Sequence, residues 1–175
     1  MTFGVQAPDQ ELPIVNLRPT ELFVAKEPTR IVTILGSCVA VCLHDRRRRV
    51  GAMCHGFLPR MRVHSEADEC SRFVDCAIHY MVQELIEHCG ASLRDMEAKL
   101  VGGARTFMVG AASGSHVGPQ NIQVAREVIQ QYGLPVTLEE VGCTGGYKLF
   151  FDSHTGEVRW RQLGSGKKSG AGGRR

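Results

Sequence analysis

The sequence predicts a single layered domain of mixed α-helix and β-strand. Segments typical of strands stand before and after two amphipathic segments typical of helices, the order found in α/β and α+β layered domains. The chain has 175 residues, 43% of them hydrophobic, which suits one core of ordinary size. No apolar run approaches the roughly 18 residues that span a bilayer, so we expect no direct membrane insertion.

The N-terminal part predicts two strands separated by a short break. Residues 1–19 show no sustained period and are expected to form an irregular or short-strand lead-in. Residues 30–35 are a β-branched run that ends at Gly36, and residues 39–43 are almost continuously apolar. Such runs are typical of strands buried on both faces.

A hairpin is expected next. Asp45 and the four arginines 46–49 mark an exposed turn, after which residues 50–57 return as another strand. The arginines could form a docking patch, although a solvated turn is the simpler interpretation.

Two helices are expected in the middle of the chain. The first covers residues 71–89 and ends at Gly90, a typical C-cap. The second covers residues 121–132, with Asn121 as its N-cap. Residues 92–100 are ambiguous between a capped turn and a strand. The apolar stripe of the first helix consists of Val74, Ile78, Met81, Val82, Leu85 and Cys89.

The C-terminal part predicts three further strands, at residues 135–142, 147–151 and 157–161. The last twelve residues are rich in glycine and serine and carry four basic and no acidic residues, which is typical of a flexible tail. We therefore expect a lead-in at 1–19, the folded domain at 20–163 and a flexible basic tail at 164–175.

Charge and cysteine content exclude several classes of protein. The net charge is +3, but the tail supplies all of it, so the near-neutral body does not predict nucleic acid binding. The seven cysteines contain no CxxC pair and no zinc-ligand spacing. No secretion signal is recognisable, so we expect a cytoplasmic protein whose cysteines are mostly small buried hydrophobes.

The glycine-rich segments do not predict a cofactor. Gly102-Gly103-Ala104 and residues 110–118 match neither a dinucleotide fingerprint nor a P-loop. Tight turns and close backbone approach explain them without a phosphate. We expect neither a metal nor an organic cofactor.

Cys38 is the candidate nucleophile. It follows a Gly36-Ser37 break between two apolar runs. A turn there can leave backbone N–H groups free to lower the pKa of a thiol and to hold an oxyanion, which makes Gly36 and Ser37 candidate oxyanion and substrate-binding residues. A helix N-terminus after Cys38 would act in the same way, and an ordinary buried cysteine remains the alternative.

His55 is the candidate base. If the hairpin turns near residues 45–49, Cys38 and His55 return to each other across adjacent strands, and a Cys–His pair is the minimal unit of thiol catalysis. His44 and His64 are competitors, one at the turn and one in a loop. Thr33 could hydrogen-bond His55 and fix its tautomer, although threonine is also simply a good strand former.

At these residues the chain resembles the chemoreceptor glutamine deamidase family, CheD. The resemblance is carried by TILGSCVAVCL at residues 33–43 and GAMCHGFLP at residues 51–59. It continues in RFVDCAI at 72–78, KLVGGA at 99–104 and VGPQN at 117–121. About residues 20 to 161 are covered. Tyr147 stands where the family often has an arginine.

The resemblance implies a single-domain layered α/β/α sandwich with a mostly antiparallel or mixed sheet. It also implies a Cys-His-Thr triad, carried over to Cys38, His55 and Thr33. The implied enzyme is a protein-glutamine glutaminase that converts chemoreceptor glutamines to glutamate through a cysteine thioester, in chemotactic adaptation. A CheC-type phosphatase is an implied partner. The alternatives are a non-catalytic adaptor that binds chemoreceptors or such a phosphatase, and a peptidase.

Overall fold

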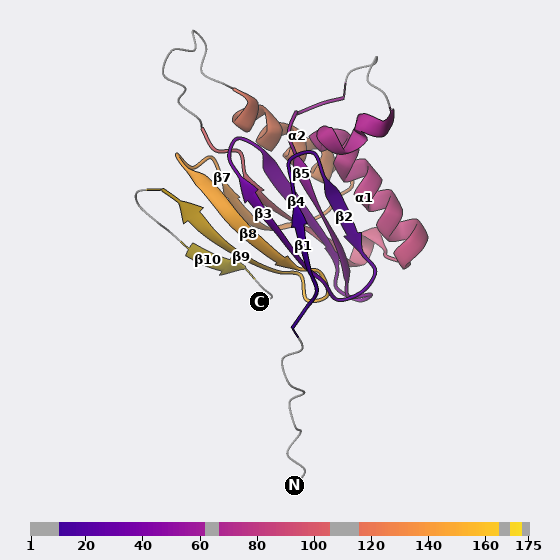
Figure 1. The fold of residues 1–175 in the computed structure, drawn as a ribbon. Coiled ribbons are helices and arrows are strands. Elements are labelled where there is room, and N and C mark those ends of the chain that lie inside the picture. Colours follow the sequence, from indigo (N-terminus) through magenta and orange to yellow (C-terminus); the bar gives the residue numbers. More distant parts are fainter. Residues whose placement is uncertain (1–10, 62–66, 106–115, 165–168, 173–175) are drawn as a thin grey trace.

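The computed structural model describes residues 11–61, 67–105, 116–164 and 169–172. These residues form two five-stranded sheets that pack face to face, and two helices that cover the other face of one sheet (Figure 1). The strands are β1 (Ile14–Leu17), β2 (Leu22–Ala25), β3 (Arg30–Leu35), β4 (Val39–Asp45), β5 (Val50–Gly56), β6 (Met96–Gly102), β7 (Val136–Val141), β8 (Gly146–Asp152), β9 (Glu157–Leu163) and β10 (Ser169–Gly172).

The two sheets are mixed. The outer sheet has the order β1-β3-β8-β9-β10, and the central sheet has the order β2-β5-β4-β6-β7. One pair in each sheet is parallel, β1 with β3 and β6 with β7, and the other pairs are antiparallel. The predicted single-domain α/β class with mixed sheets is therefore confirmed. The layers are, in order, the helices, the central sheet and the outer sheet. In the described residues, the outer sheet therefore stands where the expected α/β/α sandwich has its second layer of helices.

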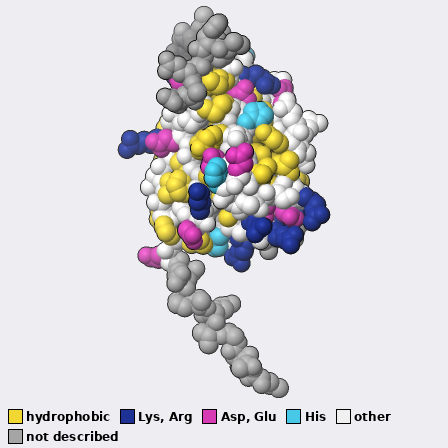
Figure 2. Space-filling model, turned by 90° about the vertical axis from the view of Figure 1, so that its right-hand side faces the viewer, with side chains coloured by type: hydrophobic (Ala, Val, Ile, Leu, Met, Phe, Trp, Pro, Cys, Tyr) yellow, Lys and Arg dark blue, Asp and Glu magenta, His cyan; other side chains and the backbone are white. Residues whose placement is uncertain are grey.

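The predicted hairpin is β4 and β5. Its antiparallel register pairs Ala40 with His55 and Asp45 with Val50. The Asp45 side chain accepts the backbone N–H groups of Arg47 and Arg48 at 2.9 and 2.8 Å, which stabilises the tight turn. The four arginines are exposed. Figure 2, a view onto the α1 side, shows Lys and Arg side chains concentrated at the lower end of that face.

Helix α1 (Val74–Cys89) has the predicted stripe facing the central sheet, and Gly90 ends it in the left-handed region at φ 65°. The prediction began too early, because residues 67–72 form the separate 3-10 helix η1 (Ala67–Arg72). The break is at Phe73, whose extended backbone pairs with Leu58 beyond the end of β5.

Helix α2 (Val117–Gln131) begins four residues earlier than predicted, so the assignment of Asn121 as its N-cap is wrong. Gly118 and Pro119 lie in the first turn of α2, where a proline is tolerated because the missing N–H has no partner within the helix. Asn121 is instead a buried residue inside the helix.

The C-terminal strands are confirmed as β7, β8 and β9. Residues 92–100 resolve into the short 3-10 helix η2 (Leu93–Asp95) and most of β6. Residues 169–172, inside the segment whose composition predicts a flexible tail, form β10 against β9. Among the described residues, no helix is both long and apolar enough to span a membrane.

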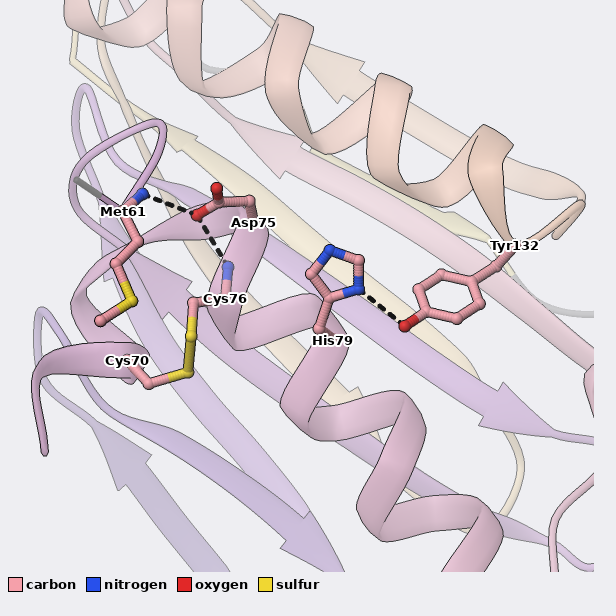
Figure 3. Close-up of a disulfide and its surroundings, with 6 residues drawn as sticks. All are labelled: Met61, Cys70, Asp75, Cys76, His79 and Tyr132. Carbon is pink, nitrogen blue, oxygen red and sulfur yellow. Dashed lines mark hydrogen bonds between the residues drawn. A yellow bond between two sulfur atoms is a disulfide. The ribbon is translucent and has the colours of Figure 1, made fainter. Parts of the chain in front are cut away.

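The cysteines are not all free. Cys70 in η1 and Cys76 in α1 form a disulfide (Figure 3), which the expectation of small buried thiols did not include. The first turn of α1 is also held by the Asp75 carboxylate, which accepts the N–H groups of Met61 and Cys76 at 3.0 and 2.8 Å (Figure 3). The other five cysteines are free.

Candidate active site

Cys38 lies where the chain passes from one sheet to the other. Residues 36–38, here called the crossover turn, connect β3 of the outer sheet to β4 of the central sheet. Because β4 is a strand, the alternative of a helix N-terminus after Cys38 is wrong. The Cys38 side chain packs in the core between the sheets, and the residue is 8% exposed.

The glycine-rich segment at the end of β6 forms backbone hydrogen bonds with the crossover turn. Ala104 N–H donates to Gly36 O at 2.9 Å, and Gly103 N–H donates to Cys38 O at 2.7 Å. Gly102 has φ 113°, and a Cβ at that position would lie 2.5 Å from Cys38 O. Close backbone approach therefore accounts for these glycines, as the sequence predicted.

Gly36 does not give the crossover turn a left-handed backbone conformation. Its φ lies outside the left-handed region, so the turn does not depend on glycine's conformational freedom. A Cβ at Gly36 would meet no atom of the described residues within 4 Å. Within the part of the chain that the structure describes, the space beside the crossover turn is therefore open at this position.

His55 lies on β5 and is 2% exposed. Ala40 is directly opposite His55, and Cys38 precedes Ala40 by two residues. Cys38 and Ala40 pack in the same core between the sheets, and residues directly opposite each other on paired strands share a face. Cys38, one residue before β4 begins, therefore lies diagonally from His55 on the face between the sheets.

Thr33 connects the outer sheet to His55. Its Oγ1 lies 2.7 Å from His55 Nδ1 and 2.9 Å from Leu17 O. The hydroxyl has one hydrogen, and Leu17 O can only accept, so the hydroxyl donates to Leu17 O. His55 Nδ1 must then carry a hydrogen and donate to Thr33 Oγ1. The lone pair of the neutral ring is left on Nε2, the nitrogen needed by a base that takes a proton from a thiol.

Burial keeps the pair neutral. It lowers the pKa of His55 to about 4, with the Glu21 carboxylate acting in the opposite direction. It also raises the pKa of the Cys38 thiol, and the backbone N–H of Cys38 only partly opposes this rise. We expected backbone amides to lower the pKa of Cys38. Its pKa is raised instead, because desolvation of the thiolate is a larger effect than the backbone hydrogen bond.

His44, one of the two competing histidines, does not join this site. His44 lies near the hairpin turn, opposite Gly51, with its Nδ1 3.8 Å from Glu97 Oε1. His64 lies outside the described residues. Among the residues that the structure describes, no three side chains form a group that could hold a metal ion.

Tyr147 contributes to the core. It is fully buried, pairs with Leu35 across β3 and β8, and donates its hydroxyl to Glu140 Oε1 at 3.2 Å. Its ring packs edge-on against Trp160 at a centroid distance of 5.7 Å. The residue at this position therefore supports the strand that leads into the crossover turn and presents no side chain to the surface.

A cleft lies beside the end of β5, and the sequence did not indicate it. Its volume is about 880 Å³. The segment after β5, the start of α1 and one face of α2 form its walls. The lining residues are Leu58, Pro59, Arg60, Met61, Arg72, Phe73, Val117, Gln120, Gln123, Val124 and Glu127. It begins three residues after His55.

A buried thiol and an imidazole on one sheet face, with a hydroxyl fixing the imidazole, is the arrangement found in thiol-dependent acyl-transfer enzymes. Comparison with known proteins gives the family. Residues 57–162 match the family described as CheD chemotactic sensory transduction. The chain belongs to this CheD family.

Three relatives show how far the similarity extends. The chain is 41% identical to a Geobacter sulfurreducens protein named probable chemoreceptor glutamine deamidase CheD 2, over 87% of this chain and 92% of that protein. It is 40% identical to an Anaeromyxobacter dehalogenans protein named probable chemoreceptor glutamine deamidase CheD 1, over 85% and 84%. It is 33% identical to the Thermotoga maritima chemoreceptor glutamine deamidase CheD, over 85% and 91%.

Proposed function

We propose that this chain hydrolyses the side-chain amide of selected chemoreceptor glutamines, with Cys38 as nucleophile, His55 as base and Thr33 as the residue that orients His55. The relatives named above support the substrate class. The observation that carries the residue roles is the hydrogen-bond chain from His55 Nδ1 through Thr33 Oγ1 to Leu17 O, because it directs the basic Nε2 away from Thr33 and leaves it available to Cys38.

The first half of the reaction forms a thioester. His55 Nε2 takes the proton of the Cys38 thiol as Sγ attacks the carboxamide carbon of the glutamine. The carbonyl oxygen gains the negative charge, and backbone N–H groups of the crossover turn, at Gly36, Ser37 and Cys38, stabilise it. His55 then gives its proton to the departing nitrogen, and ammonia leaves.

The second half restores the enzyme. His55 Nε2 takes a proton from water as the water oxygen attacks the thioester carbon. The C–S bond breaks, glutamate forms, and the Cys38 sulfur takes back the proton held by His55. The proposed steps need no metal or organic cofactor, because the pair supplies both the nucleophile and the proton transfers.

Access to the site has two elements. The open space beside Gly36 lets a carboxamide approach the crossover turn. The cleft that begins at Leu58 is where we place the receptor chain that flanks the glutamine. Chemoreceptors are thus the proposed partners. The cytoplasmic location stays a prediction from the lack of a recognisable secretion signal, and the CheC-type phosphatase stays a prediction from the sequence resemblance.

The test compares two cysteine variants. A receptor fragment incubated with the wild type should release ammonia and gain the mass difference between an amide and an acid at specific glutamines. Cys38→Ala should abolish both signals. Cys42→Ala removes another buried thiol, from the strand that follows Cys38, and should retain them. Full activity of Cys38→Ala would overturn the assignment, and cleavage of the fragment would show a peptidase instead.

A further inference from the structure

Asn121 of α2 connects the two segments that carry the proposed catalytic pair. It is fully buried. Its Nδ2 donates to Ser37 O at 3.3 Å and to Phe57 O at 3.2 Å. Ser37 immediately precedes Cys38, and Phe57 follows His55 by two residues. One side chain therefore holds the crossover turn and the end of β5 together.

The two carbonyl oxygens that Asn121 contacts can only accept hydrogen bonds, so the side-chain amide must present its nitrogen to them. A side-chain amide nitrogen has two hydrogens, and here two carbonyl oxygens accept them. The flipped orientation would place Oδ1 against both carbonyl oxygens, so the hydrogen-bond pattern fixes the assignment. Oδ1 is buried and has no hydrogen-bond partner within the described part of the chain. Since an unpaired buried acceptor costs folding free energy, packing alone does not account for an asparagine here.

The bond to Ser37 O controls where the Cys38 N–H points. Ser37 C=O and Cys38 N–H belong to one trans peptide plane and point in opposite directions. Holding the oxygen on the α2 side therefore directs the N–H away from α2. This N–H belongs to the same residue as the attacking Sγ, so it lies beside the point where the attacked carbonyl would develop its charge.

The three carbonyl oxygens of the crossover turn all accept hydrogen bonds, and Asn121 supplies the one that comes from a side chain. Gly36 O and Cys38 O accept backbone N–H groups from Ala104 and Gly103. Of the three successive carbonyls in the crossover turn, only Ser37 O is described as bound by a side chain. A substitution at residue 121 can therefore release this one peptide plane while its neighbours stay fixed.

We propose that Asn121 is a positioning residue that orients the Cys38 N–H as an oxyanion donor and holds the crossover turn against the strand that carries His55. The inference rests on the proposed role of Cys38 as the nucleophile. It assigns Asn121 no contact with the substrate.

Two probes of Cys38 separate this role from a structural one. Acylation by p-nitrophenyl acetate passes through an oxyanion and needs the N–H donor, whereas alkylation by iodoacetamide has no oxyanion. We expect Asn121→Asp, which has the same shape and no amide hydrogens, to slow Cys38 acylation by about 10- to 100-fold and to leave Cys38 alkylation nearly unchanged. Asn121→Ser can supply one hydrogen and should recover part of the acylation rate.

Val128→Ala is the matched control, because Val128 is a buried residue of the same helix that packs in the core on the other side of the central sheet. The inference is overturned if, at an equal loss of thermal stability, Asn121→Asp slows acylation no more than Val128→Ala does. It is also overturned if acylation and alkylation fall in parallel. The Cys38-dependent nitrophenol burst needs no receptor, so failure to deamidate a receptor fragment would contradict the proposed function and leave this measurement valid.

Discussion

Removing the Thr33 hydroxyl tests the hydrogen-bond chain behind His55. Thr33→Val keeps the shape of the side chain and removes its oxygen. Thr33 is 3% exposed, and its Oγ1 makes both the 2.7 Å contact with His55 Nδ1 and the 2.9 Å bond to Leu17 O. The substitution therefore leaves a buried donor and a buried acceptor without these partners.

Two magnitudes follow from this geometry. An unpaired buried polar group costs about 1–3 kcal/mol, so we expect a loss of about 2–3 kcal/mol of unfolding free energy after partial relaxation. For a chain of this size that lowers Tm by about 5–10 °C. In the transition state His55 is an imidazolium and its bond to Thr33 is charge-assisted, worth about 1.5–3 kcal/mol. The loss corresponds to a decrease in kcat of about 10- to 100-fold.

The assay is ammonia release from a receptor fragment, measured beside thermal unfolding. KM should change little, because Thr33 lies behind His55 and does not face the substrate. Thr33→Ser keeps the hydroxyl and should retain most of kcat. If Thr33→Val lowers Tm as expected and leaves kcat at the wild-type value, the hydroxyl has only a structural role and the reasoning about the His55 tautomer is refuted.

Three further predictions concern the thiol, the imidazole and the disulfide. Because burial raises the pKa of Cys38 above its ordinary 9.0, iodoacetamide should alkylate Cys38 at a rate that keeps rising with pH beyond 9.0, and a plateau at acidic pH would instead reveal a preformed thiolate–imidazolium pair. The pKa of His55 is about 4 in the folded chain and 6.5 ordinarily, so the unfolded chain binds more protons between these values, and the unfolding free energy in urea should fall by about 3 kcal/mol as pH falls through that window. His55→Gln should lack this portion of the pH dependence, and an unchanged slope in that variant would exclude His55 as its source. The disulfide joins Cys70 and Cys76, six residues apart, and a loop this short predicts a loss of about 2 kcal/mol on reduction, measured by urea unfolding with and without dithiothreitol. Since neither cysteine faces the site, a large loss of kcat in the Cys70→Ala/Cys76→Ala variant would contradict this assignment.

The elements that could be predicted from sequence are those with a strong local signal. The hairpin was predictable because apolar runs flank a turn of four arginines, and helix α1 because its stripe repeats every three to four residues. The hairpin alone predicted that Cys38 and His55 return toward each other, and the register places His55 opposite Ala40, two residues after Cys38. The start of α2 was misplaced because asparagine is a typical N-cap residue, although the helix begins four residues before Asn121.

The contacts that could not be predicted join segments far apart in the chain. Asn121 bonds to Ser37 and Phe57 across separations of 84 and 64 residues, and no local pattern indicates which helix will lie over the crossover turn. The stacking of the two sheets likewise depends on tertiary contacts that no local sequence pattern indicates. The pKa of Cys38 depends on how completely those sheets bury the thiol, so the sequence suggested activation by nearby amides and missed the larger effect of desolvation.

A neutral resting pair determines what the rest of the site must supply. Burial lowers the pKa of His55 to about 4 and raises the pKa of the Cys38 thiol above its ordinary value, so moving the proton from thiol to imidazole is unfavourable in the resting site. Attack at Cys38 therefore depends on stabilising the negative charge once it has moved to the carbonyl oxygen of the substrate. That stabilisation depends on the direction of the backbone N–H groups in the crossover turn, so the proposed role of Asn121 predicts that losing its bond to Ser37 O slows the acylation of Cys38.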